Sequence, residues 1–160
     1  SRHSASGLPD MYHRILVPVE NSSYDERILD HVRQLARYCG ASVVLIHVAD
    51  GWAARNIQQL NLRESEEMRD DRAYIEGLAT RLTADGLSAE ALLATGDPSA
   101  EIAAAAERER CDLIAMSTHG HRFIADLIYG SVANGVRHMT SVPVLLLRAP
   151  AATKQKVAAT

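Results

Sequence analysis

The chain has 160 residues, of which 47% are hydrophobic and 23% charged, and its formal net charge is −3. This length suits a single domain that buries its core without disulfides or a metal ion. The absence of a basic excess argues against nucleic acid as a partner. No apolar run approaches the ~20 residues of a membrane span, and residues 1–10 lack the apolar centre of a signal peptide. A cytoplasmic protein is therefore expected.

The first structural signals lie close to the amino terminus. Residues 15–19 form a short apolar run that is typical of a strand covered on both faces. Ser23 is predicted to cap the helix that follows, in a capping box with Glu26. Apolar residues recur at helical spacing as far as Cys39. Gly40 then ends the helix, because only glycine takes the left-handed conformation without steric cost.

The same alternation continues to residue 148. A helix with a charged start at residues 63–72 is predicted to end at Gly86. Another helix opens with Asp97 as its cap and Pro98 in its first turn. A last helix is expected over residues 131–139, with Val132, Val136 and Met139 facing inward. The four further strands are predicted at residues 43–48, 87–94, 112–116 and 142–147.

Five strands separated by helices imply right-handed crossovers and one parallel sheet. The predicted fold is therefore α/β, a three-layer α/β/α domain with a five-stranded parallel sheet. In such sheets, ligands lie beyond the carboxyl ends of the strands, where the strand order reverses. A functional site is therefore expected after Val19, Val48 and Ser117.

The turn after the first strand, Glu20-Asn21-Ser22-Ser23, matches no standard nucleotide signature. It lacks the three spaced glycines of a dinucleotide fingerprint and the Gly-Lys-Ser/Thr ending of a P-loop. The chain also has no serine between flanking glycines, as a nucleophile elbow requires. Glu20 can be a carboxylate that approaches a helix start or a ligand contact, and the residues alone leave both readings open.

The loop after the fourth strand carries a stronger signal. The run Ser117-Thr118-His119-Gly120 is followed, after nine residues, by Gly130-Ser131. Gly120 lets the backbone approach a ligand closely. Gly130 and Ser131 are placed at the start of the last predicted helix, where unpaired N–H groups suit phosphates. Loop glycines followed by an ordinary serine cap are the alternative interpretation.

This spacing resembles the nucleotide motif of the universal stress protein family, Gly-x2-Gly-x9-Gly-Ser/Thr. Four further segments are similar to that family: Ile15-Leu16-Val17-Pro18, His47-Val48, Gly96-Asp97-Pro98 and Ser141-Val142-Pro143-Val144. The resemblance implies a fold like that of the adenine nucleotide alpha hydrolases, with sheet order 3-2-1-4-5. It also implies a homodimer, formed through the fifth strand.

The resemblance covers residues 12–148, which are expected to form one universal-stress-protein-like domain. Residues 1–11 and 149–160 are predicted to be disordered segments on either side of it. No internal repeat and no second domain are predicted.

The resemblance further implies ATP as the ligand and assigns its contacts. The base and ribose would lie against Pro18, Val19, Glu20, Val48 (through its backbone), Met116 and Ser117. The phosphates would be held by Gly120, Gly130, Ser131 and Val132. A magnesium ion can arrive with ATP, held largely by phosphates and water.

Two of these positions depart from the family's ATP binders, which usually have glycine at position 117 and aspartate at position 20. Ser117 is expected to narrow the pocket slightly. Glu20 adds one methylene, which can move its carboxylate away from the usual partner.

Residues that could carry out chemistry are few. His119 and His121 flank Gly120 and could donate to phosphate or position a water, or they are simply exposed loop histidines. His47 is predicted to be a hydrogen-bonded core residue. No spacing indicates a dedicated metal site, and no nucleophile–base–orienter set can be assembled from the chain order.

The preferred function is therefore a regulatory, non-enzymatic module that binds ATP and responds to stress. One alternative is a slow ATPase or self-phosphorylating protein that uses Ser131 or the region of His119 and His121. The other is a nucleotide-free structural or interaction protein of the same fold.

Overall fold

The computed structural model describes the backbone of residues 11–50, 61–118 and 125–148. Nine elements follow one another in that part of the chain: β1 (Arg14–Pro18), α1 (Asp25–Cys39), β2 (Ser42–Asp50), α3 (Asn61–Ala84), β3 (Ala89–Gly96), α4 (Pro98–Arg108), β4 (Leu113–Ser117), α5 (Ala125–Met139) and β5 (Val144–Leu147). The segments predicted to be disordered lie, except for Met11, outside the described residues, so the domain boundaries stay a prediction.

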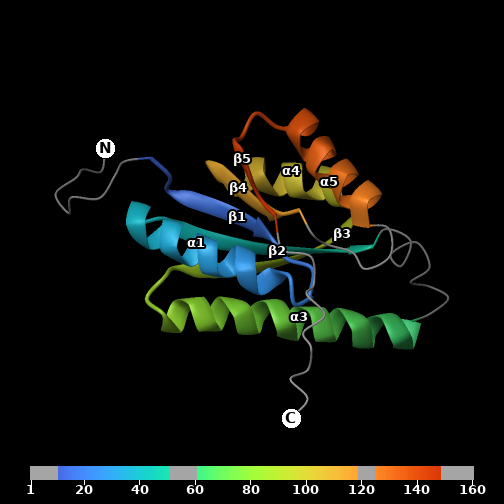
Figure 1. Cartoon of the computed structure of the whole chain (residues 1–160). Coiled ribbons are helices and arrows are strands. Elements are labelled where there is room, and N and C mark those ends of the chain that lie inside the picture. The colour runs from blue at the N-terminus through green and yellow to red at the C-terminus, as the bar shows by residue number, and fades with distance from the viewer. Residues whose placement is uncertain (1–10, 51–60, 119–124, 149–160) are drawn as a thin grey trace, which may run out of the picture.

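The five strands form one parallel sheet in the order β3-β2-β1-β4-β5. This confirms the predicted fold class and the predicted strand order. Helices α1 and α3 cover one face of the sheet, and α4 and α5 cover the other (Figure 1). The chain returns to the centre of the sheet after β3 and adds β4 on the far side of β1. The strand order therefore reverses between β1 and β4.

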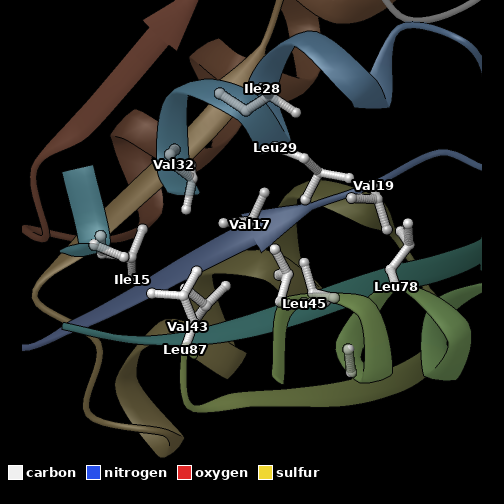
Figure 2. Close-up of a cluster of buried hydrophobic side chains, with 14 of the residues drawn as sticks. Ile15, Val17, Val19, Ile28, Leu29, Val32, Val43, Leu45, Leu78 and Leu87 are labelled. Atoms are coloured by element: carbon white, nitrogen blue, oxygen red, sulfur yellow. The ribbon is translucent and has the colours of Figure 1, made fainter. Parts of the chain in front are cut away.

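Two apolar layers fill the space between the sheet and its helices. Alternate side chains of β1 point to opposite faces, because successive residues of a strand do so. Ile15 and Val17 pack with Ile28 of α1 and Leu78 of α3 on one face, as Figure 2 shows. Leu16 packs on the other face, in the cluster that α4 and α5 cover. Because both faces of β1 are buried, its residues form an uninterrupted apolar run.

Several local predictions are confirmed. Gly40 follows α1 with a φ of 69°, and Gly86 follows α3 with a φ of 92°, both in the left-handed region. Asp97 caps α4, since its carboxylate accepts from the N–H of Ala100 at 3.0 Å. His47 is hydrogen-bonded and largely buried, as predicted.

Two predicted helix starts are wrong. Helix α1 begins at Asp25, and the residue before it, Tyr24, makes no side-chain cap, so Ser23 is not the cap. Helix α5 begins at Ala125, six residues before the predicted start, and continues through Gly130 and Ser131. A glycine inside a helix costs only about 1 kcal/mol relative to alanine, so Gly130 does not have to mark a helix end.

The inward face of α5 also needs one correction. Val136 is fully buried and Val132 packs against the same core, as predicted. Met139, expected to face inward, is 55% exposed. It is the last residue of α5, after which the chain returns to the sheet as β5.

Candidate functional site

The register of the sheet aligns the predicted ligand positions at its carboxyl edge. Ile15 is level with Leu113 of β4, and Arg14 is level with Ser42 of β2. Carrying the same offsets to the end of β1 places Val19 level with Ser117. It likewise places Glu20 level with Val48. The observed β1–β4 pairing itself ends at Leu16 and Ile114. The carboxyl ends of β2, β1 and β4 are neighbours in the sheet, next to the reversal of strand order.

The residues predicted to hold the base and ribose lie at that edge. Pro18 ends β1, and Val19 directly after it is buried. The β1–β2 pairing ends at Pro18 and Ile46, two residues before Val48. Of the remaining three, Glu20 is exposed, Met116 is buried in β4, and Ser117 ends β4 half-buried. These residues therefore belong to the carboxyl ends of neighbouring strands or directly follow them, whereas their contact with a ligand stays a prediction.

The residues predicted to hold phosphates are less completely described. Val132 lies in α5, and its carbonyl accepts from the Ser99 hydroxyl at 3.2 Å, which ties α5 to α4. Gly130 and Ser131 lie within the helix rather than at its start. Helical pairing engages their N–H groups with carbonyls four residues earlier. Gly120 lies outside the described residues, as do His119 and His121.

The turn between β1 and α1 is organised by one buried carboxylate. Asp25 is 1% exposed, and its two oxygens accept from the backbone N–H groups of Glu20, Asn21 and Ser22 at 3.0, 2.9 and 3.1 Å. Asn21 takes a φ of 64°, and this left-handed residue lets three successive amides converge. Such a concave set of N–H groups, called a nest, binds anions. Here the anion belongs to the chain itself.

Helix α3 fixes this turn from the other side. The Tyr74 hydroxyl donates to Asp25 at 2.6 Å, and the Asn21 side-chain amide donates to Asp71 at 3.2 Å. The other Asp71 oxygen lies 3.2 Å from Nε2 of His47. Nδ1 of His47 lies 2.9 Å from the Val19 carbonyl oxygen, which can only accept, so this nitrogen carries a hydrogen.

The surroundings of Glu20 disfavour a negative charge. Burial among neighbouring groups and the Asp25 carboxylate raise the pKa of Glu20 to about 7 from an ordinary 4.5. A hydrogen bond from the Ser22 hydroxyl at 3.3 Å and the nearby His47 oppose the rise. The residue keeps contact with solvent, which screens the neighbouring charges. The Glu20 carboxyl group therefore holds its proton to a higher pH than an ordinary glutamate does.

Sequence reasoning missed the three side chains that shape the turn, namely Asp25, Asp71 and Tyr74. Asp25 lies five residues after Glu20, and it looked like an ordinary acid in the first turn of a helix. Its position shortly after the polar turn Asn21-Ser22-Ser23 was the available signal. Nothing in the local sequence around Asp71 or Tyr74 indicates that α3 reaches this turn.

Other site types find no support in the described part of the chain. There, no group of three or more His, Cys, Asp or Glu side chains is arranged to hold a metal ion. Among the helices described, none combines the length and apolarity that crossing a membrane requires. Both cysteines are free thiols. Burial raises the pKa of Cys111 to about 11, which keeps that thiol protonated and unreactive.

Together, the strand order and its reversal between β1 and β4 define a small doubly wound α/β domain. The family model of the universal stress proteins matches residues 11–148, and the chain belongs to that family. A universal stress protein of Methanocaldococcus jannaschii is 27% identical over 155 residues, which cover 86% of this chain and 96% of the relative.

Solved structures agree with this assignment. That of the same M. jannaschii protein has a TM-score of 0.77 at 28% identity and covers 86% of this chain and 96% of its own. A universal stress protein in complex with cAMP gives a TM-score of 0.64 at 20% identity, covering 87% of this chain and 98% of its own. One from Archaeoglobus fulgidus in complex with dAMP gives 0.63 at 21% identity, covering 85% and 98%. The last two support the fold.

Proposed function

We propose that this protein is a regulatory, stress-responsive module of the cytoplasm that binds an adenine nucleotide, ATP, at the carboxyl edge of its sheet. The observation that carries the proposal is the strand order, which reverses between β1 and β4, so that Val19, Val48 and Ser117 lie at or near the carboxyl ends of neighbouring strands. Ligands of doubly wound sheets bind at this place. The adenine nucleotides cAMP and dAMP in two related structures are consistent with the ligand class.

In the proposed complex, the base and ribose lie against Pro18, Val19, Glu20, Val48, Met116 and Ser117. The phosphates lie on the side of β4 and α5, near Gly120, Gly130, Ser131 and Val132. Because α5 begins at Ala125, the helical N–H groups of Gly130 and Ser131 are engaged within the helix. We therefore propose that the Ser131 hydroxyl contacts a phosphate. Gly130 would leave space for the phosphates, because it has no side chain. A magnesium ion would be held by phosphates and water.

We further propose that the nucleotide is held without useful turnover. Among the described residues at this edge, His47 already contacts the Val19 carbonyl and Asp71, and Asp25 accepts four hydrogen bonds. Neither group is free to act as a base that activates water. The Glu20 carboxyl group, whose pKa is raised to about 7, is assigned to the base and ribose, away from the phosphates. Regulation would instead come through occupancy of the site, acting on a homodimer formed through β5.

The first experiment asks whether nucleotide is bound. Protein purified without added ligand is denatured, and the released nucleotide is identified by mass spectrometry. Calorimetric titration with ATP, ADP and AMP then gives the affinities. Incubation with magnesium and labelled ATP should release phosphate no faster than about one turnover per minute, against the ~10 per second of a median enzyme. A rate near that median would contradict the regulatory proposal.

A matched pair of variants tests where the phosphates lie. Gly130→Val should weaken ATP binding, because the added side chain would obstruct the phosphates. Gly77→Val is the control, since Gly77 is also a helical glycine and a Cβ there would meet nothing within 4 Å.

Ser117→Gly should preserve or tighten binding if the serine only crowds the ribose. Equal ATP affinity of Gly130→Val and wild type would place the phosphates elsewhere. No binding by any variant and no copurified nucleotide would favour a nucleotide-free interaction protein.

A further inference from the structure

We infer that Asp25 is a positioning residue that closes the β1–α1 turn to anions, so that a ligand meets this turn with a hydrogen-bond donor and not with a phosphate. The inference concerns the anion-binding nest formed by the N–H groups of Glu20, Asn21 and Ser22. Its consequence for nucleotide orientation rests on the proposed function. The role of Asp25 itself does not.

The first step is the occupancy of the nest. Oδ1 of Asp25 accepts from the Glu20 N–H, and Oδ2 accepts from the N–H groups of Asn21 and Ser22 and from the Tyr74 hydroxyl. An ionised carboxylate offers about four acceptor positions and no donor. All three amides of the nest and the Tyr74 hydroxyl are therefore committed to Asp25. Every amide of the nest already donates to the Asp25 carboxylate, so none is free to donate to a ligand.

The second step is the cost of displacing this internal anion. Asp25 is 1% exposed, so water cannot replace the hydrogen bonds that it would lose. A ligand phosphate entering the nest would also bring negative charge against a buried carboxylate, which is strongly unfavourable. Both effects act in the same direction. The turn that in other doubly wound sheets can receive phosphate is thus filled from within.

The third step is what remains for a ligand at this turn. Glu20 is exposed beside the nest, two residues after the end of β1, and its carboxyl group offers acceptor oxygens. The Val19 carbonyl oxygen faces His47. That carbonyl oxygen is already engaged, so the accessible acceptor at this end is the Glu20 carboxylate in its ionised form. Ribose hydroxyls or the amino group of a base suit it, and phosphates must lie towards β4 and α5.

The experiment follows the backbone amide signals of Glu20, Asn21 and Ser22 by nuclear magnetic resonance in the full chain. Wild-type protein is titrated with inorganic pyrophosphate and, separately, with adenosine. Adenosine should shift these signals, whereas pyrophosphate should leave them in place up to millimolar concentration. Saturable pyrophosphate shifts of the three amides in wild type would overturn the inference. So would adenosine binding that leaves them unmoved.

The variant Asp25→Ser removes the internal carboxylate and should make the same three amides sensitive to pyrophosphate. Glu26→Gln is the matched control, because it removes the neighbouring acid of α1, which contacts Arg81 and none of the nest amides. It should behave as wild type. A folded Asp25→Ser protein whose nest still ignores pyrophosphate would contradict the role of Asp25. If Asp25→Ser does not fold, the wild-type titration still decides the inference.

A second readout separates this role from a purely structural one. The groups that surround Glu20 are Asp25 of α1 and His47 of β2, with Asp71 and Tyr74 of α3 behind them. Since Asp25 is an anion, its removal should lower the titration midpoint of the Glu20 carboxyl carbon in Asp25→Ser but not in Glu26→Gln. An unchanged midpoint would count against the inference. Absence of any adenosine or ATP binding would contradict the proposed function, while the pyrophosphate titration would still test Asp25.

Discussion

Replacing Tyr74 with phenylalanine tests the link between α3 and the β1–α1 turn with the least disturbance. The change removes one hydroxyl, which donates to Oδ2 of Asp25 at 2.6 Å. Burial, followed by the Asp25 carboxylate, raises the pKa of Tyr74, so the hydroxyl keeps its proton and remains a donor. A hydrogen bond to a charged group contributes about 1.5–3 kcal/mol to stability.

The expected loss in the free energy of unfolding is about 1.5–3 kcal/mol, towards the lower figure because Asp25 keeps three backbone donors. For a chain of this size, each kcal/mol lowers Tm by about 2–4 °C, so the melting temperature should fall by ~3–12 °C. Urea unfolding followed by circular dichroism measures the loss. Tyr38→Phe is the control, since Tyr38 is 63% exposed and its change should cost less than about 0.5 kcal/mol. If Tyr74→Phe is no more destabilising than Tyr38→Phe, the proposed energetic role of the Asp25 contact is refuted.

Three further outcomes are expected. The pKa of Glu20 is raised from 4.5 to about 7 in the folded chain, so between these pH values the folded state binds a proton that the unfolded state has released. The stabilisation from this proton is therefore complete below about pH 4.5 and is lost as pH rises through 7. Glu20→Gln should therefore flatten the fall in urea midpoint between about pH 5 and pH 8, and parallel profiles would contradict this. Gly135→Ala should cost ~1–3 kcal/mol, because its Cβ would lie 2.5 Å from Oγ of Ser99; adding Ser99→Gly should restore part of the loss, and a neutral single variant would refute the close α4–α5 packing. Leu146 is 43% exposed on the edge strand β5, so Leu146→Lys should yield monomers by light scattering at micromolar concentration, and a monomeric wild type would rule out the dimer.

The sequence by itself determined the elements whose signals are local. Both faces of β1 are buried, so residues 15–17 had to be apolar whatever lay next to them. Gly40 and Gly86 occupy left-handed positions that the adjoining helices require. Asp97 caps its own helix within three residues. The strand order came from resemblance to a family and not from these signals.

Tertiary structure decided the rest, because the deciding contacts join residues that are far apart in the chain. Tyr74 reaches Asp25 across 49 residues, and the Asn21 side chain reaches Asp71 across 50. Helix α5 continues through Gly130 although glycine is a weak helix former. Propensity differences of about 1 kcal/mol are small beside the packing of a helix against a sheet. In the sequence, Asp25 resembled an ordinary acid at a helix start. Only the folded turn shows that its carboxylate accepts hydrogen bonds from three backbone amides.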